Sequence, residues 1–379
     1  MSNDSRLASR DSFMDATDLA PWLDRAMPWL IAAYVVAATI AWSTRVFTTH
    51  AHWTYPVFRG SFYHLMAHGN LYAPDPAQGY DLFKYSPTFA LLFAPFALLP
   101  PAVGLLAWDL ANALVLLAAV GRLLPRREAA IAALVILPEV FVSAQASQSN
   151  ALVAGLIVLA FVALERSRLM SAAIAIGVGA AIKIFPLAAL SFALPSRARW
   201  RFAWRWALVA AVLLALPLGV VPASLLQQEY RWWAGVESVD ALARGASALG
   251  VLARAVPGSW PNWPVQLAAT LALLAPLVVR RRDWNDPRFL RLYLCSLLVY
   301  VVLFNHQAER PSYVIAVTGV AIWYAMSPIT WWRTALTLLT VLGLKAAPCL
   351  VVWLAMQYDL WAYRTDESAV TTGVTVRSA

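Results

Sequence analysis

The side chains best suited to chemistry in this chain are ionisable groups placed at the ends of long apolar runs. In the segment FNHQAERPSY, His306, Glu309 and Arg310 fall within five residues, directly before Pro311. Such a group can form the wall of a polar pocket, and the charge of His306 can change near neutral pH. The plainer alternative is an internal pair, Glu309 with Arg310 or Glu309 with His306.

A second group lies in the long polar stretch 48–101. Asp81 is followed by Lys84 and Tyr85 at the start of an apolar, proline-broken piece. A carboxylate at this place can act as general base on an acceptor hydroxyl. Alternatively, Asp81 is a solvated acid that caps a helix or pairs with Lys84.

Lys183 lies near the end of the apolar run GVGAAIKIFP, three residues before Pro186. A cation at the centre of a bilayer costs roughly 2.5–3.5 kcal/mol on insertion scales, so it is expected near a partner or an interface. One interpretation is that Lys183 holds a lipid-linked phosphate as a point charge. The other is that its side chain snorkels to the outer interface.

Composition identifies the elements that carry these residues. Of 379 residues, 61% are hydrophobic and 13% are charged, whereas soluble domains have roughly 45–50% apolar and about 25% charged residues. The apolar residues form runs about as long as a bilayer core requires. The sequence therefore predicts an all-α, polytopic integral membrane protein with about twelve spans. These are 27–47, 102–121, 128–145, 149–164, 169–184, 185–195, 203–222, 263–280, 289–305, 311–326, 331–344 and 346–360.

Arginine clusters at the ends of these runs predict the topology, because positive charge is retained in the cytoplasm. All four clusters fall on the cytoplasmic side if residues 86–100 form a re-entrant or interfacial helix and not a span. They are 122–127, 166–168, 197–205 and 280–291. We therefore expect a cytoplasmic tail (1–26), a membrane domain (27–360) and a disordered cytoplasmic tail (361–379). The first loop (48–101) and a second large loop (223–262) would face outside, together with Gln148, Lys183 and His306.

Two loop segments carry interfacial patterns. Phe58, Phe62 and Leu65 share one helical face, with Arg59 and His64 elsewhere, which predicts an amphipathic helix lying in the membrane interface. The loop 223–262 mixes tryptophans with acids and with arginines such as Arg254. That mixture suits a sugar or phosphate ligand, and equally an amphipathic helix at the headgroups.

Several function classes are disfavoured. The net charge of +9 comes from arginines at span ends and not from a basic face, which argues against nucleic-acid binding. Cys295 and Cys349 lie in apolar runs without metal-ligand spacing, so we expect buried thiols and no metal site. Nucleotide-binding and hydrolase motifs do not occur in a suitable context, which argues against a nucleotide-driven pump.

Four segments together resemble glycosyltransferase family 87, membrane mannosyltransferases of the GT-C fold. They are NLYAPDPAQGYDLFKYSPTFALLFAPFALLP, SQSNALVAGLIVLAF, AIAIGVGAAIKIFPLAAL and GASALGVLARAV. The resemblance implies an outward-facing site, a polyprenyl-phosphate sugar donor and inversion at the sugar carbon. The chain departs from the family pattern where Thr54 occupies the position of the usual acid, and where Gly245 or Ala246 replaces an asparagine. We therefore expect another carboxylate to have taken over the role of the base.

The expected site combines these considerations. The candidate catalytic residues are Asp81 and Glu309. The candidate donor-phosphate residues are Lys183, Lys84 and Arg59. The candidate substrate-binding residues are Tyr85, His64, Gln148, Asn150, His306 and Arg254.

The expected activity is transfer of a hexose, mannose by resemblance, from a polyprenyl-phosphate donor to a lipid-linked or cell-envelope acceptor. It would take place at the outer, periplasmic face of the inner (plasma) membrane, without cofactor or metal, with membrane lipid as a further partner. Two other functions stay open. One is a transporter or flippase of a lipid-linked glycan, which would be expected to show inverted repeats and ionisable residues at mid-membrane. The other is a non-catalytic envelope-assembly subunit, which the missing acid at Thr54 allows.

Overall fold

Apolar runs bounded by arginine, proline or polar residues form the helices of this chain. The computed structural model describes residues 23, 25–47, 54–75, 81–240, 243–256, 258–343 and 345–363. The predicted tails, 1–26 and 361–379, lie almost entirely outside these residues. Within the described residues every regular element is helical, which agrees with the predicted all-α class.

The long elements follow the predicted runs closely, except the helix Ala223–Asp240, which forms within the predicted loop 223–262. They are α1 (Met27–Phe47), α5 (Pro101–Leu123), α6 (Arg126–Gln145), α7 (Asn150–Glu165), α8 (Leu169–Ile182), α9 (Arg199–Ala215), α10 (Ala223–Asp240), α12 (Trp263–Val279), α13 (Pro287–Leu303), α14 (Tyr313–Met326), α15 (Trp331–Leu342) and α16 (Ala346–Trp361). The short helices are α2 (Tyr55–Met66), α3 (Pro87–Leu92), α4 (Ala94–Ala97) and α11 (Ala248–Ala255).

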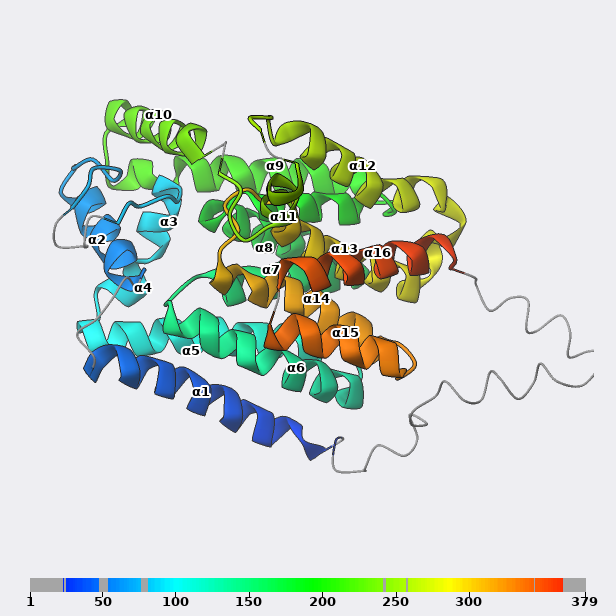
Figure 1. Ribbon diagram of the computed structural model, residues 1–379. Coiled ribbons are helices and arrows are strands. Elements are labelled where there is room, and N and C mark those ends of the chain that lie inside the picture. Colours follow the sequence, from blue (N-terminus) through cyan, green and yellow to red (C-terminus); the bar gives the residue numbers. More distant parts are fainter. Residues whose placement is uncertain are drawn as a thin grey trace, which may run out of the picture.

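The core is built around α7, α13 and α14. In α14 every residue from Tyr313 to Trp323 is buried, as expected of a helix that is apolar all round. Helix α7 packs between α5 and α8 and also contacts α13 and α14, while α1, α5 and α6 lie along one side of the bundle (Figure 1).

Other helices expose large apolar side chains, as lipid-facing helices do. On α9, Leu208 and Val212 are about half exposed, and on α12 so are Leu267 and Leu271. Four segments among the described residues are long and apolar enough to cross a bilayer: α1, α5, α6 and the stretch Arg199–Gly219 that begins with α9. The fold is therefore that of a helical membrane protein, and the number of its spans stays a prediction.

One predicted span lacks the length to cross. Residues 185–195 contain a 3-10 helix, Phe185–Ala193. At a rise of about 2.0 Å per residue it covers roughly 18 Å, against a hydrocarbon core of about 30 Å. The predicted count of about twelve spans is therefore not confirmed at this segment.

In the first loop, the apolar face of α2 has other packing partners than the sequence predicted. Residues 86–100 are broken into α3 and α4, as the prolines predicted. Helix α2 also forms where expected, but its apolar face packs on protein and not on lipid. Phe58 is fully buried, with its ring edge-on to Phe89, Phe93 and Trp108. The local pattern did not predict these partners, which come from α3, its C-cap residue Phe93 and α5. The placement of α2 in the membrane interface stays a prediction.

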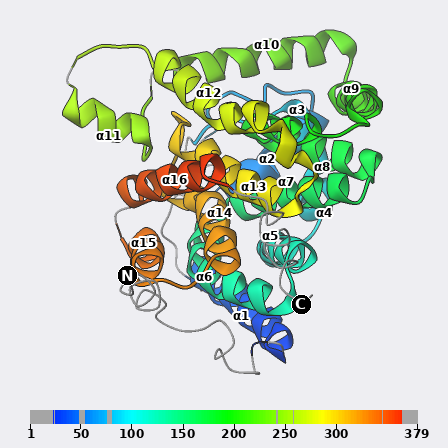
Figure 2. The same cartoon turned by 90° about the vertical axis from the view of Figure 1, so that its right-hand side faces the viewer.

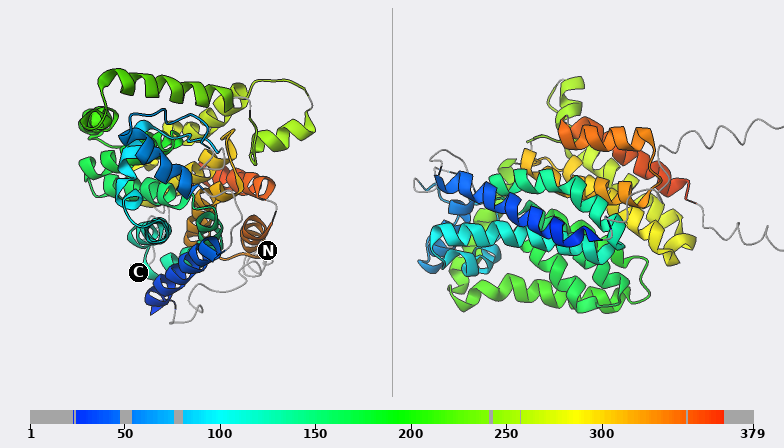
Figure 3. Two further views of the ribbon diagram at one scale, coloured as in Figure 1. Left: turned by 90° about the vertical axis from the view of Figure 1, so that its left-hand side faces the viewer. Right: turned by 90° about the horizontal axis from the view of Figure 1, so that it is seen from below.

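The two ends of the bundle differ in composition. The start of α1 and the end of α16 lie at the end opposite to α2, α3 and α4 (Figure 1). The arginine clusters meet at the same end as these termini. Arg166 donates to the Arg122 carbonyl at 3.0 Å, and Arg291 pairs with Glu165 at 3.2 Å. Helices α9 and α10 run in different directions. In Figure 2 and in the left view of Figure 3, α9 is seen end-on while α10 lies across the view.

Candidate functional site

Segments far apart in the chain meet around one cavity of about 720 Å³. They are the piece before α3, the turn between α6 and α7, the end of α8 and the connection from α13 to α14, with α10 and α12 completing the wall. The polar and aromatic residues of the lining are Thr54, Asp81, Lys84, Tyr85, Gln148, Lys183, Phe185, Trp233, Glu237, Gln266, Tyr300, Phe304, Asn305, His306, Gln307 and Glu309.

Most of the residues singled out from the sequence lie in this wall. Both candidate bases are there, as are two of the three candidate phosphate-binding cations. The predicted residues that line the cavity are Asp81, Lys84, Tyr85, Gln148, Lys183, His306 and Glu309. The predicted topology had put their segments on one face, and they do lie close together. Their chemical roles stay predictions.

Glu309 is held toward the cavity by a short chain of polar contacts. The Gln148 side-chain amide donates to its carboxylate at 3.4 Å, and the Tyr85 hydroxyl lies 3.5 Å from the Gln148 carbonyl oxygen. Arg310 turns away and pairs with Glu139 at 2.6 Å. The alternative of a Glu309–Arg310 pair is therefore wrong, and the Glu309 carboxylate faces the space where a substrate would bind.

Lys183 lies one residue beyond the end of α8. Its backbone is extended, and Pro186 follows too closely for the helix to continue. Gly179 allows this sharp exit, since a Cβ there would lie 3.2 Å from Pro186 Cβ. The Lys183 ammonium lies 5.9 Å from the ring centroids of both Tyr85 and Phe185. The carboxylates that act on it electrostatically are Glu309 and Glu237.

Tyr85 and His306 supply further hydrogen-bonding groups to the wall. Burial raises the pKa of the Tyr85 phenol well above its usual range, so the hydroxyl stays protonated and can donate a hydrogen bond. His306 Nδ1 lies 3.5 Å from the side-chain nitrogen of Gln266, which also donates to the Phe304 carbonyl at 3.0 Å. These groups can orient a polar ligand by hydrogen bonds.

Four predicted site residues lie elsewhere. Arg59 packs on the Tyr63 ring, 4.9 Å from its centroid, and His64 pairs with Asp75 at 3.3 Å. Arg254 is exposed at the end of α11. Asn150 is fully buried at the start of α7, and neither side-chain polar atom has a hydrogen-bond partner among the described residues. The cavity wall does not include them.

The sequence reading missed part of the wall on α10 and α12. Glu237, with Trp233 one turn before it, belongs to the loop 223–262, whose mixed composition did not single out either residue. Its carboxylate accepts from the Gln307 amide at 3.2 Å. Gln266 was not predicted, although a lone amide in the apolar run of α12 is a usable signal, because polar groups in such runs face protein and not lipid.

Thr54, at the position of the family's usual acid, also lines the cavity, and its hydroxyl donates to the Ala146 carbonyl at 2.7 Å. The cavity therefore lies beside the place where an acid was expected and is absent. Within the described residues there is no group of three or more His, Cys, Asp or Glu side chains suited to a metal ion. What the wall can supply is a base from a carboxylate and neutralisation of an anion from Lys183.

Comparison with known proteins supports the resemblance drawn from the sequence. The model of glycosyltransferase family 87 matches residues 83–305, which includes Lys84, Gln148 and Lys183 and stops just before His306 and Glu309. No curated protein matches the chain.

Proposed function

The chain belongs to glycosyltransferase family 87, and from this premise we propose that it moves a hexose, mannose, from a polyprenyl-phosphate donor to a lipid-linked or cell-envelope acceptor. The reaction would take place in the cavity, which would open on the outer face of the plasma membrane. The observation that carries the proposal is the meeting of Glu309 and Lys183, a carboxylate and an ammonium 126 residues apart in sequence, in one wall.

Glu309 is proposed as the general base. It would take the proton of the acceptor hydroxyl while that oxygen attacks the anomeric carbon from the face opposite the phosphate. Asp81 is the second candidate, but it is less well placed. One of its carboxylate oxygens accepts from the adjacent Leu82 N–H at 3.0 Å, whereas Glu309 contacts Gln148 and acts electrostatically on Lys183.

Lys183 is proposed to stabilise the departing phosphate. As the bond from the anomeric carbon to the phosphate oxygen breaks, negative charge collects on the phosphate, and an ammonium fixed nearby lowers the energy of that state. Lys84 lies in the same wall and is the second candidate cation. The polyprenyl chain would lie in the surrounding lipid, along the exposed apolar faces of α9 and α12. A donor anchored in the bilayer in this way would require an enzyme that is itself embedded in the membrane.

The test is a transfer assay with membranes from cells that express the full chain. Radiolabelled polyprenyl-phosphate mannose and, separately, polyprenyl-phosphate glucose serve as donors, and the membrane extract supplies acceptors. Loss of a general base should lower kcat of Glu309→Gln by about 100-fold or more, while Asp81→Asn should have a smaller effect. The control is Glu165→Gln, which removes a carboxylate at the opposite end of α7 from Gln148 and should leave transfer unchanged.

Two results would contradict the proposal. A folded Glu309→Gln protein with the wild-type rate would remove Glu309 from the mechanism. Movement of a glycolipid across the membrane with no sugar transfer from either donor would favour the transporter alternative.

A further inference from the structure

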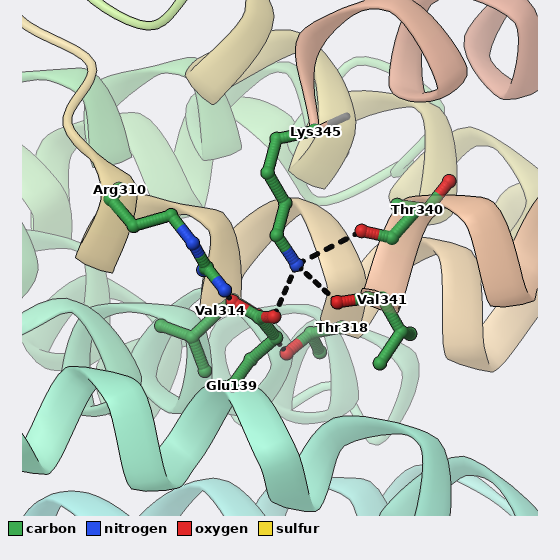
Figure 4. A network of polar contacts seen from close by, with 7 residues as sticks. All are labelled: Glu139, Arg310, Val314, Thr318, Thr340, Val341 and Lys345. Carbon is green, nitrogen blue, oxygen red and sulfur yellow. Dashed lines mark hydrogen bonds and ion pairs between the residues drawn. The ribbon is translucent and has the colours of Figure 1, made fainter. Parts of the chain in front are cut away.

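A charge cluster lies next to the cavity wall and consists of Glu139, Arg310 and Lys345 (Figure 4). Glu139 and Lys345 are buried, whereas the Arg310 side chain is 47% exposed. Glu139, on α6, is 1% exposed. One carboxylate oxygen accepts from Arg310 Nη1 at 2.6 Å, and the other pairs with the Lys345 ammonium. Lys345 also donates to the carbonyls of Thr340, at 3.0 Å, and Val341. Two cations thus share one carboxylate.

The place of Glu139 indicates a role beyond stability. It lies six residues before the end of α6, about 9 Å along the helix axis at 1.5 Å per residue. A carboxylate in a helix long and apolar enough to cross a bilayer is costly, and such residues usually serve function. Apolar side chains often stabilise a fold as well as a buried ion pair does, so the cluster is better explained by what it positions.

Arg310 directly follows Glu309, the proposed base. The backbone at Glu309 is extended, with φ −116° and ψ 169°, and in extended chain neighbouring side chains point to opposite sides. When Glu139 holds Arg310 on one side, the Glu309 carboxylate is therefore directed to the other, toward Gln148 and the cavity. Gln148 lies just past the end of α6, so the same part of the chain contacts both members of the 309–310 pair.

Lys345 extends the cluster to the last helices. It is the residue before α16 and has a positive φ of 28°, a conformation that is strained for a residue with a side chain. Its side-chain contacts with Glu139 and with the carbonyls at the end of α15 stabilise this turn. The cluster therefore ties α6, the α13–α14 connection and the α15–α16 turn together at one point behind the cavity.

From this geometry we propose that Glu139 is a positioning residue, which orients the Glu309 carboxylate toward the substrate by anchoring Arg310. This inference rests on the proposed function, because it takes Glu309 as the base. Glu139 itself does not line the cavity and touches no reacting atom.

The experiment compares Arg310→Gln with the wild type, in the full chain purified in detergent. This variant leaves the Glu139–Lys345 pair in place, so it is less disruptive than removal of Glu139. The first readout is modification of Glu309 by a water-soluble carbodiimide, measured by peptide mass spectrometry relative to Glu237 in the same cavity. The second is kcat and KM for the sugar donor. The control is Arg291→Gln, which breaks the partly buried ion pair to Glu165 at the other end of the bundle.

We expect Arg310→Gln to change Glu309 reactivity several-fold and to lower kcat by up to about 100-fold, with little change in KM, because a misdirected base slows the chemical step alone. Arg310→Lys should restore part of both, and the control should change neither. Glu139→Asp keeps every charge but shortens the anchor, so it should act in the same direction if Arg310→Gln does not fold.

The inference is overturned if folded Arg310→Gln or Glu139→Asp keeps the wild-type Glu309 reactivity and kcat. The carbodiimide readout needs no activity, which separates the two claims. If the wild type transfers no sugar, the proposed function fails, while the labelling still decides whether Glu139 positions Glu309.

Discussion

Glu309 and Arg310 are adjacent and of opposite charge, so their side chains could pair with each other or point apart. Only the tertiary contacts of the two side chains decide between these arrangements. The sequence shows Glu139 as an acid in an apolar run, but its partners are 171 and 206 residues away. No local pattern predicts contacts at such separations. Lys183 was predictable because its cost in an apolar run is a property of one residue and its immediate surroundings.

A buried acid on α10 leads to a prediction about pH. Glu229 is fully buried, and its carboxylate accepts from the Leu71 N–H at 3.3 Å. Burial raises the pKa of this carboxyl to about 7, against about 4.3 in the unfolded chain. Between these two pH values the folded protein holds a proton that the unfolded chain has lost. The stability contributed by this group therefore falls as pH rises through that window, and is constant above it.

Glu229→Gln should remove this dependence, because the amide can still accept from Leu71 and carries no charge. The variant should be stabilised by as much as about 4 kcal/mol at pH 8 and little changed at pH 4. Thermal unfolding of the purified protein in detergent across this pH range measures the effect. An unchanged difference between variant and wild type at all pH values would show that Glu229 titrates in the folded protein as it does in the unfolded chain.

At the scale of elements, apolar length and its boundaries predicted most helices, and packing between elements decided the rest. The predicted run 149–164 became α7 (Asn150–Glu165) because Ser149 and Arg166 limit it on both sides. The run 185–195 has the same composition as a span, yet Pro186 and its packing against Gly179 turn it into a 3-10 helix. The helix at α2 was predicted, but not the face on which it packs, since its partners are distant in sequence.

Two glycines on α5 allow a matched test of that packing. A Cβ on Gly104 would overlap the Tyr55 hydroxyl of α2 and the Phe96 carbonyl, whereas the nearest atom to a Cβ on Gly121 is Met27 Cε at 3.8 Å. Gly104→Ala should therefore lower the free energy of unfolding by about 1–3 kcal/mol. Gly121→Ala should be neutral or slightly stabilising, because alanine favours helix.

Chemical or thermal unfolding of both variants in detergent provides the comparison. Equal stability of the two alanine variants would mean that α2 and α4 do not sit against α5 as closely as described, and would weaken the placement of Thr54 at the cavity wall.

At the scale of the whole molecule, the cavity follows from topology. The alternation of basic span ends predicted that Gln148, Lys183 and Glu309 share one face, and the structure brings them into one wall. Trp233 and Gln266 joined that wall without being predicted, because α10 and α12 close it from the side and their approach depends on packing. What remains to be tested is which leaflet this face occupies.

Accessibility labelling tests that claim most directly. Cys295 and Cys349 are replaced by alanine, and single cysteines are introduced at Lys84, His306 and Arg199 in the full chain. A membrane-impermeant thiol reagent added to intact cells should label the cysteines at Lys84 and His306, and should label that at Arg199 only after the membrane is opened. Labelling of Lys84→Cys and His306→Cys from opposite sides, or of both only after permeabilisation, would contradict an outward-facing transfer site.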